Sequence, residues 1–220
     1  MQLSIIIVNY RSWGSLEKTL SALVAESAPL FEIIVVDNDS ADGQLEQFRR
    51  RFPRVKFVVA LGNRGFAHAC NTGAGASTGE LLLFLNPDIH ARPEDINLLV
   101  AEKNTHSQYA ILTACQTNSH RRPRKVGDTF PRLCTSVPAA RALLHKIRPD
   151  AYPSGRLTEG SHATPVPFDW VSGSVLLISR ADLNKLGGWN ERFWLYYEDV
   201  DLCMKARRLG MRAACTTAVS

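Results

Sequence analysis

Short aliphatic runs alternate with polar turns and with stretches of helical apolar spacing along the first half of the chain. Alternation of this kind is typical of the strands and helices of a parallel sheet. The aliphatic runs predict strands over residues 3–8, 33–36, 55–59, 81–85 and 109–115. The stretches between them predict helices over residues 16–24, 45–52, 66–76 and 93–100. Ser12 or Ser15 is the expected N-cap of the first helix, and Ser40 that of the second.

The second half of the chain is less regular. From Gln116 to about Pro167 the periodicity fades while Pro, Arg and Ser become frequent, which predicts an irregular insertion. Beyond it the sequence predicts a strand over residues 175–178, a helix over 181–186 ended by two glycines, a helix over 199–209 and a strand over 211–219. Together the elements predict one α/β domain, with a mostly parallel central sheet and helices on both faces.

Composition narrows the classes of protein and partner. The chain has 220 residues, 45% of them hydrophobic, but no long apolar run and no secretory signal, so we expect a cytoplasmic protein. The five cysteines are scattered without a Cys-x-x-Cys pair, which indicates reduced packing residues rather than a zinc or redox site. A net charge of +5 favours anionic partners, although charge alone does not choose among them.

A basic run, His-Arg-Arg-Pro-Arg-Lys, occupies residues 120–125. Most such runs are solvated loops, but this one also suits an anionic lipid or a phosphate of a substrate. Aromatic residues do not interleave with it, so we expect no nucleic-acid partner. Two interpretations of this run therefore stay open: a solvated loop, and a peripheral contact with the inner face of the membrane.

Polar clusters follow four of the predicted strands at the point where each strand ends. They are Asn9 and Tyr10, residues 37–39, residues 62–65, and Asn86 with Asp88. In an open α/β sheet the carboxyl ends of the strands form the ligand-binding edge, so we expect these clusters to lie together. The first turn lacks the glycines of a nicotinamide site, and no phosphate-binding Gly-x-x-x-x-Gly-Lys-Ser/Thr loop is present. The remaining interpretation is a site whose carboxylates hold a metal on a diphosphate.

Six motifs in this order resemble those of the family 2 glycosyltransferases with the A-type glycosyltransferase fold, especially the rhamnosyltransferase-like bacterial branch. The resemblance covers nearly the whole chain, and the ordered set is specific although each motif alone is weak. The motifs are residues 4–10 (SIIIVNY), 35–40 (VVDNDS), 63–67 (NRGFA) with Asn71 and Gly73, 85–88 (LNPD), 187–191 (GGWNE) and 196–202 (YYEDVDL).

The resemblance implies how the donor is held. Asp37 would bind the base of a UDP- or dTDP-sugar, with rhamnose as one candidate sugar, and Asp88 would ligate a divalent metal, Mg²⁺ or Mn²⁺, on the diphosphate. By the same resemblance the other donor-binding residues are Asn9, Tyr10, Arg11, Asn63, Gly65 and Asn86. Many relatives have Asp-x-Asp where this chain has Asn86-Pro87-Asp88, which leaves one charged ligand and predicts weaker metal binding.

The resemblance also implies the chemistry. Asp199, or the adjacent Glu198, would take the proton from the hydroxyl of a glycan or lipid-linked acceptor in cell-surface polysaccharide synthesis. A metal would neutralise the leaving diphosphate, and in-line attack would invert the anomeric carbon. Residues 1–115 would bind the nucleotide sugar, residues 116–166 would form an insertion that is mobile without acceptor, and residues 167–220 would supply the acceptor side and the base.

Other interpretations stay open. The residues 37–39 and 86–88 also suit turns that merely end strands, and Glu198 and Asp199 suit any helix start. The glycines mostly suit tight turns and close packing, and none of the six histidines is assigned to chemistry. Relatives usually continue beyond the position of Ser220, so we expect a truncated chain. Its alternative function is a nucleotide-sugar-binding module without catalysis; a nucleotidyltransferase, which needs a Gly-rich basic loop after the first strand, ranks last.

Overall fold

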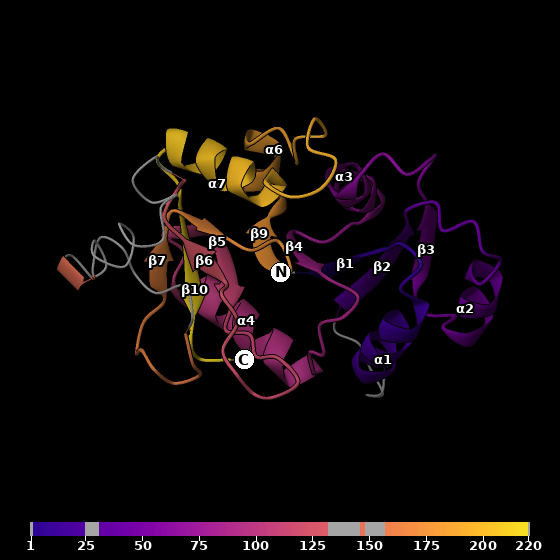
Figure 1. Ribbon diagram of the computed structural model, residues 1–220, viewed down its shortest axis with the longest axis horizontal. Helices are drawn as coiled ribbons and strands as arrows, with labels where there is room; N and C mark the ends of the chain where they lie inside the picture. The colour runs from indigo at the N-terminus through magenta and orange to yellow at the C-terminus, as the bar shows by residue number, and fades with distance from the viewer. Residues whose placement is uncertain (1, 25–30, 132–145, 148–156, 220) are drawn as a thin grey trace.

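An eight-stranded sheet with the order β3-β2-β1-β4-β9-β5-β10-β7 runs through the computed structural model (Figure 1). The structure describes residues 2–24, 31–131, 146–147 and 157–219. The strands of this sheet are β1 (Leu3–Asn9), β2 (Phe31–Asp37), β3 (Lys56–Val59), β4 (Leu81–Leu85), β5 (Tyr109–Ala114), β7 (Val166–Phe168), β9 (Val175–Ser179) and β10 (Arg212–Thr216). Two further strands, β6 (Gly127–Asp128) and β8 (Trp170–Val171), form a small separate sheet.

The prediction of a mostly parallel sheet is confirmed. β1 pairs in parallel with β2 and β4, and β5 pairs in parallel with β10. Two strands run the other way: β9 is antiparallel to β4 and β5, and β7 is antiparallel to β10. The amino end of β9 therefore lies at the sheet edge where β4 ends, which brings the residues just before Val175 to that edge.

Helices cover both faces of the sheet, as predicted (Figure 1). One face carries α1 (Trp13–Val24), α2 (Leu45–Arg51) and α4 (Pro93–Thr105), and the other carries α3 (Phe66–Ala76), α6 (Arg180–Lys185) and α7 (Glu198–Arg208). Successive side chains along a strand point to opposite faces of the sheet. Ile5 and Ile7 therefore pack with the first group of helices, while Ile6 and Val8 pack with the second. Because helices cover both faces, the strands are buried on both sides, and this explains why their sequences are continuous aliphatic runs.

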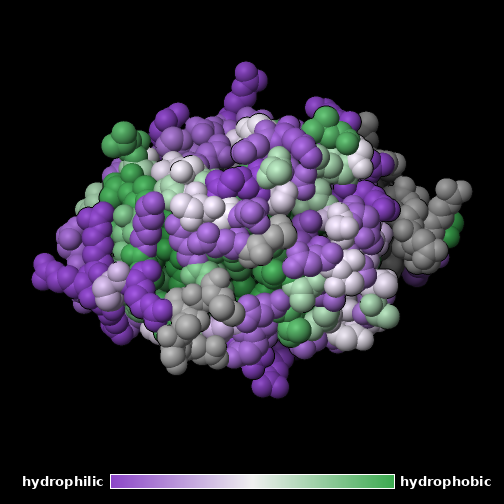
Figure 2. Space-filling view, turned by 180° about the vertical axis from the view of Figure 1, so that it is seen from behind, coloured by the Kyte–Doolittle hydropathy of each residue, from purple (hydrophilic) through white to green (hydrophobic). Residues whose placement is uncertain are grey.

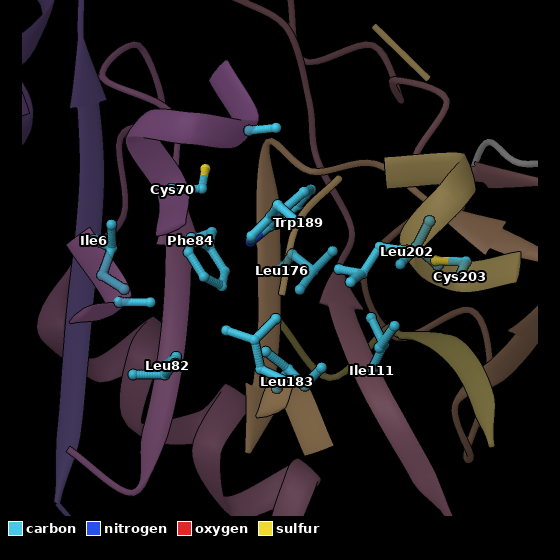
Figure 3. Packing of buried hydrophobic residues seen from close by; sticks show 14 of the residues in the cluster. Ile6, Cys70, Leu82, Phe84, Ile111, Leu176, Leu183, Trp189, Leu202 and Cys203 are labelled. Atoms are coloured by element: carbon cyan, nitrogen blue, oxygen red, sulfur yellow. The ribbon is translucent and has the colours of Figure 1, made fainter. Parts of the chain in front are cut away.

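The core on the α3, α6 and α7 side centres on Trp189, which is 2% exposed (Figure 3). Its ring lies edge-on to Phe84 and Phe66, with centroids 5.0 and 5.9 Å away. Edge-to-face aromatic pairs add to the stability of a core beyond simple burial. The chain that follows Trp189 is therefore anchored where it leaves the core.

Ser40 does not cap the second helix, so that prediction is wrong. α2 begins at Leu45 after Gln44, whose side chain makes no capping hydrogen bond. Between Ser40 and the helix the chain turns through Ala41, which has a positive φ of 50°. Ser40 instead donates its hydroxyl to Asp37 Oδ1. Ser12 occupies the N-cap position of α1, because the amides of Ser15 and Leu16 donate to its carbonyl, while its hydroxyl donates to the Tyr10 carbonyl.

The region from Gln116 to Pro167 is more regular in its described parts than predicted. Val126, Gly127 and Asp128 are buried, and β6 pairs with β8. A two-residue strand is too short to show a period, which is why the sequence pattern missed it. The expected mobility falls largely on residues 132–145 and 148–156, which lie outside the described residues.

Hydrophilic side chains dominate the face turned away from the viewer of Figure 1, with an apolar hollow across its middle (Figure 2). Among the described helices, none is both long and apolar enough to cross a bilayer.

Two glycines of α3 test how closely this helix packs on the sheet. A Cβ added at Gly73 would come within 2.4 Å of Ile6 Cγ2, whereas one added at Gly75 would meet nothing within 4 Å. Gly75→Ala should raise the free energy of unfolding by about 0.5–1 kcal/mol, because Ala favours the helix. Gly73→Ala should lower it by about 1–3 kcal/mol through overpacking. Urea unfolding measures both, and equal effects would contradict this close packing.

Candidate active site

The predicted site residues come together along one edge of the sheet. Asn9 and Asp37 end β1 and β2 and lie opposite each other in the parallel register. On the other side of β1, Ile7 pairs with Leu85, so the turn with Asp88 follows beside them. The expected gathering of Asn9, Asp37 and Asp88 at the carboxyl edge is therefore present.

A cleft of about 430 Å³ opens at this edge, and we call it the donor-side cleft. Five of the predicted site residues line it, together with Trp194 and Leu195 from the loop before α7: Tyr10, Asn63, Gly65, Asn86 and Asp88. Aromatic and amide side chains in the same cleft as the Asp88 carboxylate suit the binding of a nucleotide diphosphate. These side chains come from the turns that follow β1 and β4 and from the turn before α3, so the fold itself brings them together.

Asn9, Arg11 and Asp37 do not line the cleft but shape its wall. Asn9 is fully buried, and its Oδ1 accepts a hydrogen bond from Ser12 N at 3.2 Å. Asp37 is 4% exposed and accepts from both the amide and the hydroxyl of Ser40. Arg11 donates Nε to the Ser40 carbonyl at 3.1 Å and lies over the Tyr10 ring. Direct contacts of these three residues with a nucleotide stay predictions.

Gly65 is required by its surroundings. Its φ is +99°, and an added Cβ would come within 2.3 Å of the Trp194 carbonyl oxygen. The next amide, Phe66 N, donates to that same oxygen at 3.0 Å. Asn63 Oδ1 accepts from Gly65 N and from Asn38 Nδ2, which fixes the turn. The glycine thus lets the loop before α7 close against the start of α3.

The Asp88 carboxylate is exposed and makes no hydrogen bond or ion pair with any of the described residues. Within the described residues, no group of three His, Cys, Asp or Glu side chains could hold a metal alone. Mg²⁺ commonly binds one or two carboxylates and completes its shell with substrate phosphates and water. Asp88, with the amide of Asn86 nearby in the same turn, fits a cation shared with a bound diphosphate rather than a cage made by protein alone.

Asp199 lines a second cleft, of about 450 Å³, which we call the acceptor-side cleft. Its Oδ2 accepts from Gly173 N at 3.1 Å and its Oδ1 from Val200 N at 2.8 Å. Burial raises the pKa of Asp199, and these two amide hydrogen bonds oppose the rise. The other lining residues include Lys125, Asp128, Trp170, Ser172, Tyr196 and Tyr197. A carboxylate with a raised pKa in the lining of an aromatic cleft suits a general base.

Glu198 points elsewhere. It is 6% exposed, its Oε2 has no hydrogen-bond partner among the described residues, and it lines neither cleft. Burial raises its pKa; burial also raises the pKa of the Cys70 thiol, and the charge of Glu198 adds to that rise. Of the two adjacent carboxylates, Asp199 is the one that reaches a cleft.

A short turn of residues 172–174 connects the two clefts. Asn86 N donates to the Ser174 carbonyl at 2.9 Å, and Gly173 N donates to Asp199 Oδ2. The turn therefore touches both the motif that bears Asp88 and the carboxylate of the acceptor side. Sequence reasoning missed it, because the only signal is a Ser-Gly-Ser triplet before a strand whose direction the pattern does not reveal.

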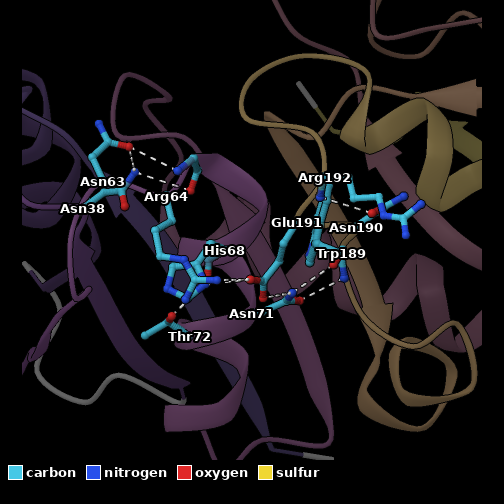
Figure 4. A network of polar contacts seen from close by, with 11 residues as sticks. Asn38, Asn63, Arg64, His68, Asn71, Thr72, Trp189, Asn190, Glu191 and Arg192 are labelled. Carbon is cyan, nitrogen blue, oxygen red and sulfur yellow. Dashed lines mark hydrogen bonds and ion pairs between the residues drawn. The ribbon is translucent and has the colours of Figure 1, made fainter.

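The loop between the two clefts is held to α3 by a polar network (Figure 4). Asn71 Nδ2 donates to the Trp189 carbonyl and Trp189 N donates to Asn71 Oδ1, both at 2.9 Å. Glu191 accepts from Asn71 and contacts His68 Nδ1, also at 2.9 Å each, and these contacts lower its pKa. His68 thus has a partner that the sequence did not suggest. The network fixes the start of the loop that carries Trp194 and leads to Asp199.

Solved structures share this fold. The crystal structure of S. aureus TarS 1-349 matches with a TM-score of 0.64 and 18% identity, over 99% of this chain and 58% of that chain. The mannosyltransferase PcManGT from Pyrobaculum calidifontis, in complex with GDP-Man and Mn²⁺, matches with a TM-score of 0.64 and 17% identity, over 98% of this chain and 56% of that chain. The likeness confirms the A-type glycosyltransferase fold.

Curated relatives cover most of this chain. The low-salt glycan biosynthesis hexosyltransferase Agl10 of Haloferax volcanii is 29% identical over 215 residues, 94% of this chain and 62% of its own length. The N-acetylglucosaminyl-diphospho-decaprenol L-rhamnosyltransferase of Mycobacterium tuberculosis is 25% identical over 217 residues, 91% of this chain and 68% of its own length. Rhamnosyltransferase WbbL of Escherichia coli K12 is 26% identical over 220 residues, 94% of this chain and 78% of its own length.

The chain thus spans about two thirds of the length of several relatives that it resembles. Residues 4–159, most of the chain, match the model of glycosyl transferase family 2. Those residues contain the β1, β2 and β4 ends that build the donor-side cleft. The chain therefore belongs to glycosyl transferase family 2.

Proposed function

We propose that this chain transfers a sugar from a UDP- or dTDP-sugar to the hydroxyl of a glycan or lipid-linked acceptor, with a divalent metal and inversion of the anomeric carbon. The observation that carries this proposal is the turn of residues 172–174, which contacts Asn86 on the donor side and Asp199 on the acceptor side. One rigid element then sets the distance between the leaving group and the base, as a direct displacement requires. The names of the rhamnosyltransferase and hexosyltransferase relatives support the reaction class.

The donor lies in the donor-side cleft in this proposal. Tyr10, Asn63 and Asn86 offer an aromatic face and amide groups to the nucleotide, and Asp88 faces its diphosphate. A solved TarS complex holds UDP and another holds UDP-GlcNAc, on a fold that this chain shares. These complexes support a uridine nucleotide as one donor, although PcManGT carries GDP-Man on the same fold.

Asp88 and Asn86 are the residues that would hold Mg²⁺ or Mn²⁺ against the donor diphosphate. A divalent cation there neutralises the charge that develops on the leaving diphosphate. The carboxylate of Asp88 fits this role because none of the described residues competes for it. Solved neighbours in complex with GDP-Man and Mn²⁺, or with UDP, GalNAc and Mn²⁺, support the use of a divalent metal.

Asp199 removes the proton of the acceptor hydroxyl as the hydroxyl attacks. Each of its oxygens accepts one backbone N–H, which holds the carboxylate in place and leaves further lone pairs for the proton. The aromatic rings of Trp170, Tyr196 and Tyr197 line the same cleft, where sugar rings commonly pack. Attack from this side, opposite the diphosphate, gives inversion.

A thermal-shift panel of UDP, dTDP and GDP, and of their sugars, tests the donor part of this proposal. We expect UDP or dTDP with Mn²⁺ or Mg²⁺ to stabilise the chain, by about 2.7 kcal/mol at a hundred times Kd. The metal should increase the shift, and GDP should give a smaller one. Absence of any nucleotide shift would refute the proposal, whereas a shift without transfer to any acceptor would favour the binding module.

A further inference from the structure

A third cavity, of about 530 Å³, lies between α4 and the sheet, and we call it the α4 pocket. Apolar side chains from β4, β5, β9 and α4 form part of its lining, such as Leu83, Leu85, Ile96, Leu99, Ala114 and Val175, and the rest is polar, including His90, Asp95 and Asn118. Asp88 lines both this pocket and the donor-side cleft, so the two adjoin. An apolar cavity beside a candidate metal ligand is not explained by donor binding.

A buried amide at the pocket has no acceptor for its hydrogens within the part of the chain that the structure describes. Gln116 lines the pocket and is 7% exposed. Its Oε1 accepts from Ser174 Oγ at 3.0 Å, but its Nε2 has no hydrogen-bond partner among the described residues. Leaving a buried donor unpaired is unfavourable, so this amide indicates a ligand with an oxygen acceptor.

The rim of the pocket is a preformed basic turn of residues 116–125. Asn118 Oδ1 accepts from the amides of His120 and Arg122 at 3.0 Å, and Arg124 N donates to the Gln116 carbonyl at 2.7 Å. Arg121, Arg122 and Arg124 are exposed, and no carboxylate of the described residues forms an ion pair with them. The turn thus presents free guanidinium groups on a fixed backbone.

The basic turn separates the α4 pocket from the acceptor-side cleft. Arg124 lines the pocket, whereas the next residue, Lys125, lines the acceptor-side cleft, pairs with Asp128 and lies over the Trp170 ring. Hydrogen bonds from Ser174 to Gln116 and between Ser172 and Ser174 connect the two sides. A molecule that crosses the turn would have one end in each site.

Three carboxylates lie at or near the pocket: Asp88 and Asp95 line it, and Glu159 lies near Cys115 and Arg92. Arg92 pairs with Asp95 at 2.9 Å, which lowers the pKa of that carboxyl. Asp88 makes no ion pair with the described residues, so its charge favours an anion held at Arg124 and Gln116 over one held at the end of the pocket that adjoins the donor-side cleft.

We propose that the α4 pocket and the basic turn bind a lipid phosphate, namely the phosphate and the first part of the apolar tail of a lipid-linked acceptor. The tail occupies the pocket, the phosphate oxygens meet Arg124 and the Gln116 amide, and the sugar reaches Asp199 across the turn. This inference rests on the proposed function and names its acceptor class. Charge complementarity at the rim and an apolar interior behind it both match an anionic amphiphile.

Calorimetry on the whole chain, with geranyl diphosphate as the probe and no divalent cation, tests this inference. Inorganic pyrophosphate and geraniol are the matched half-probes, and both should bind much more weakly. Arg124→Gln should weaken binding of geranyl diphosphate by about fivefold, the usual worth of one basic residue at an anionic surface. Ala91→Phe, which fills the pocket without changing charge, should weaken geranyl diphosphate but not pyrophosphate.

The double variant Arg50→Gln/Arg54→Gln is the charge control, because these arginines lie in and after α2, away from the residues that line the pocket. It should bind geranyl diphosphate as the wild type does. Loss of binding in this control would show attraction by net charge alone, and displacement by UDP would show binding in the donor-side cleft. Either result overturns the inference, as does an Ala91→Phe variant with unchanged affinity.

A second arm separates the acceptor from the bilayer. Vesicles of phosphatidylcholine with and without phosphatidylglycerol measure docking to bulk anionic lipid. If phosphatidylglycerol vesicles bind strongly while geranyl diphosphate does not, the turn docks on the bilayer and the inference fails. UDP stabilisation of every variant, measured alongside, confirms folding. If UDP stabilises none of the proteins while geranyl diphosphate still binds, the proposed function fails and the pocket assignment stands.

Discussion

Asp199→Asn lowers sugar transfer by about a hundredfold to ten-thousandfold, the usual worth of a general base, and leaves donor affinity nearly unchanged. Asn keeps the shape of the side chain and can still accept from Gly173 N, but it cannot take a proton. Steady-state kinetics with a UDP- or dTDP-sugar and an acceptor give kcat, and thermal shift gives donor binding. Wild-type transfer by this variant would refute the role of Asp199.

The matched control is Glu198→Gln, which should keep transfer because Glu198 is buried and lines neither cleft. If it loses transfer while Asp199→Asn keeps it, the base is Glu198. The pH profile adds a second criterion. Burial raises the pKa of Asp199, so the ionised base is present above that pKa and is lost as pH falls through it. The wild-type kcat should therefore fall with acidification above the ordinary range of aspartate, and Asp199→Asn should lack this limb.

Asp88→Asn removes the metal dependence of nucleotide binding. The ratio of UDP affinities with and without Mn²⁺ should fall to about one, because the motif has a single charged ligand and its amide replacement binds cations weakly. Isothermal titration of UDP with and without Mn²⁺ measures the ratio directly.

Asp39→Asn is the control for Asp88. Asp39 is also an exposed carboxylate at the end of a strand of the same sheet edge, with a φ of 64° that Asn tolerates well. Its replacement should leave the Mn²⁺ effect intact. If Mn²⁺ still strengthens UDP binding to Asp88→Asn, the metal is held elsewhere or binds only the nucleotide.

Much of the fold follows from the sequence because buried parallel strands leave a strong local signal. Runs such as residues 81–85 are fully buried and hydrophobic, so the sequence alone predicts that a strand is present there. Strand direction is not plain: Val175–Ile178 reads the same whether the strand runs with or against its neighbours. The reversal of β9 is decided by pairing with β4 and β5, which lie far away in sequence.

The site was predictable where it depends on strand ends and not where it depends on tertiary contacts. Asn86 and Asp88 follow β4 and reach the donor-side cleft, as the carboxyl-edge rule predicts. The burial of Asn9 could not be foreseen, since a polar residue after a strand reads as exposed. Gln116 and Lys125 were also missed as site residues, because they lie in a region where periodicity gives no guidance.

The reversed strand β9 also bears on how the molecule folds. β1 and β2 pair across a short crossover, whereas the pairing of β4 with β1 and then that of β9 with β4 each close a much longer stretch of chain. Closing a longer loop costs more conformational entropy, and contacts of large sequence separation tend to form late. Gly173 meets Asp199 only once that pairing exists. A chain in which the nucleotide-facing strands have assembled but β9 has not would therefore hold the donor side of the site and lack its base.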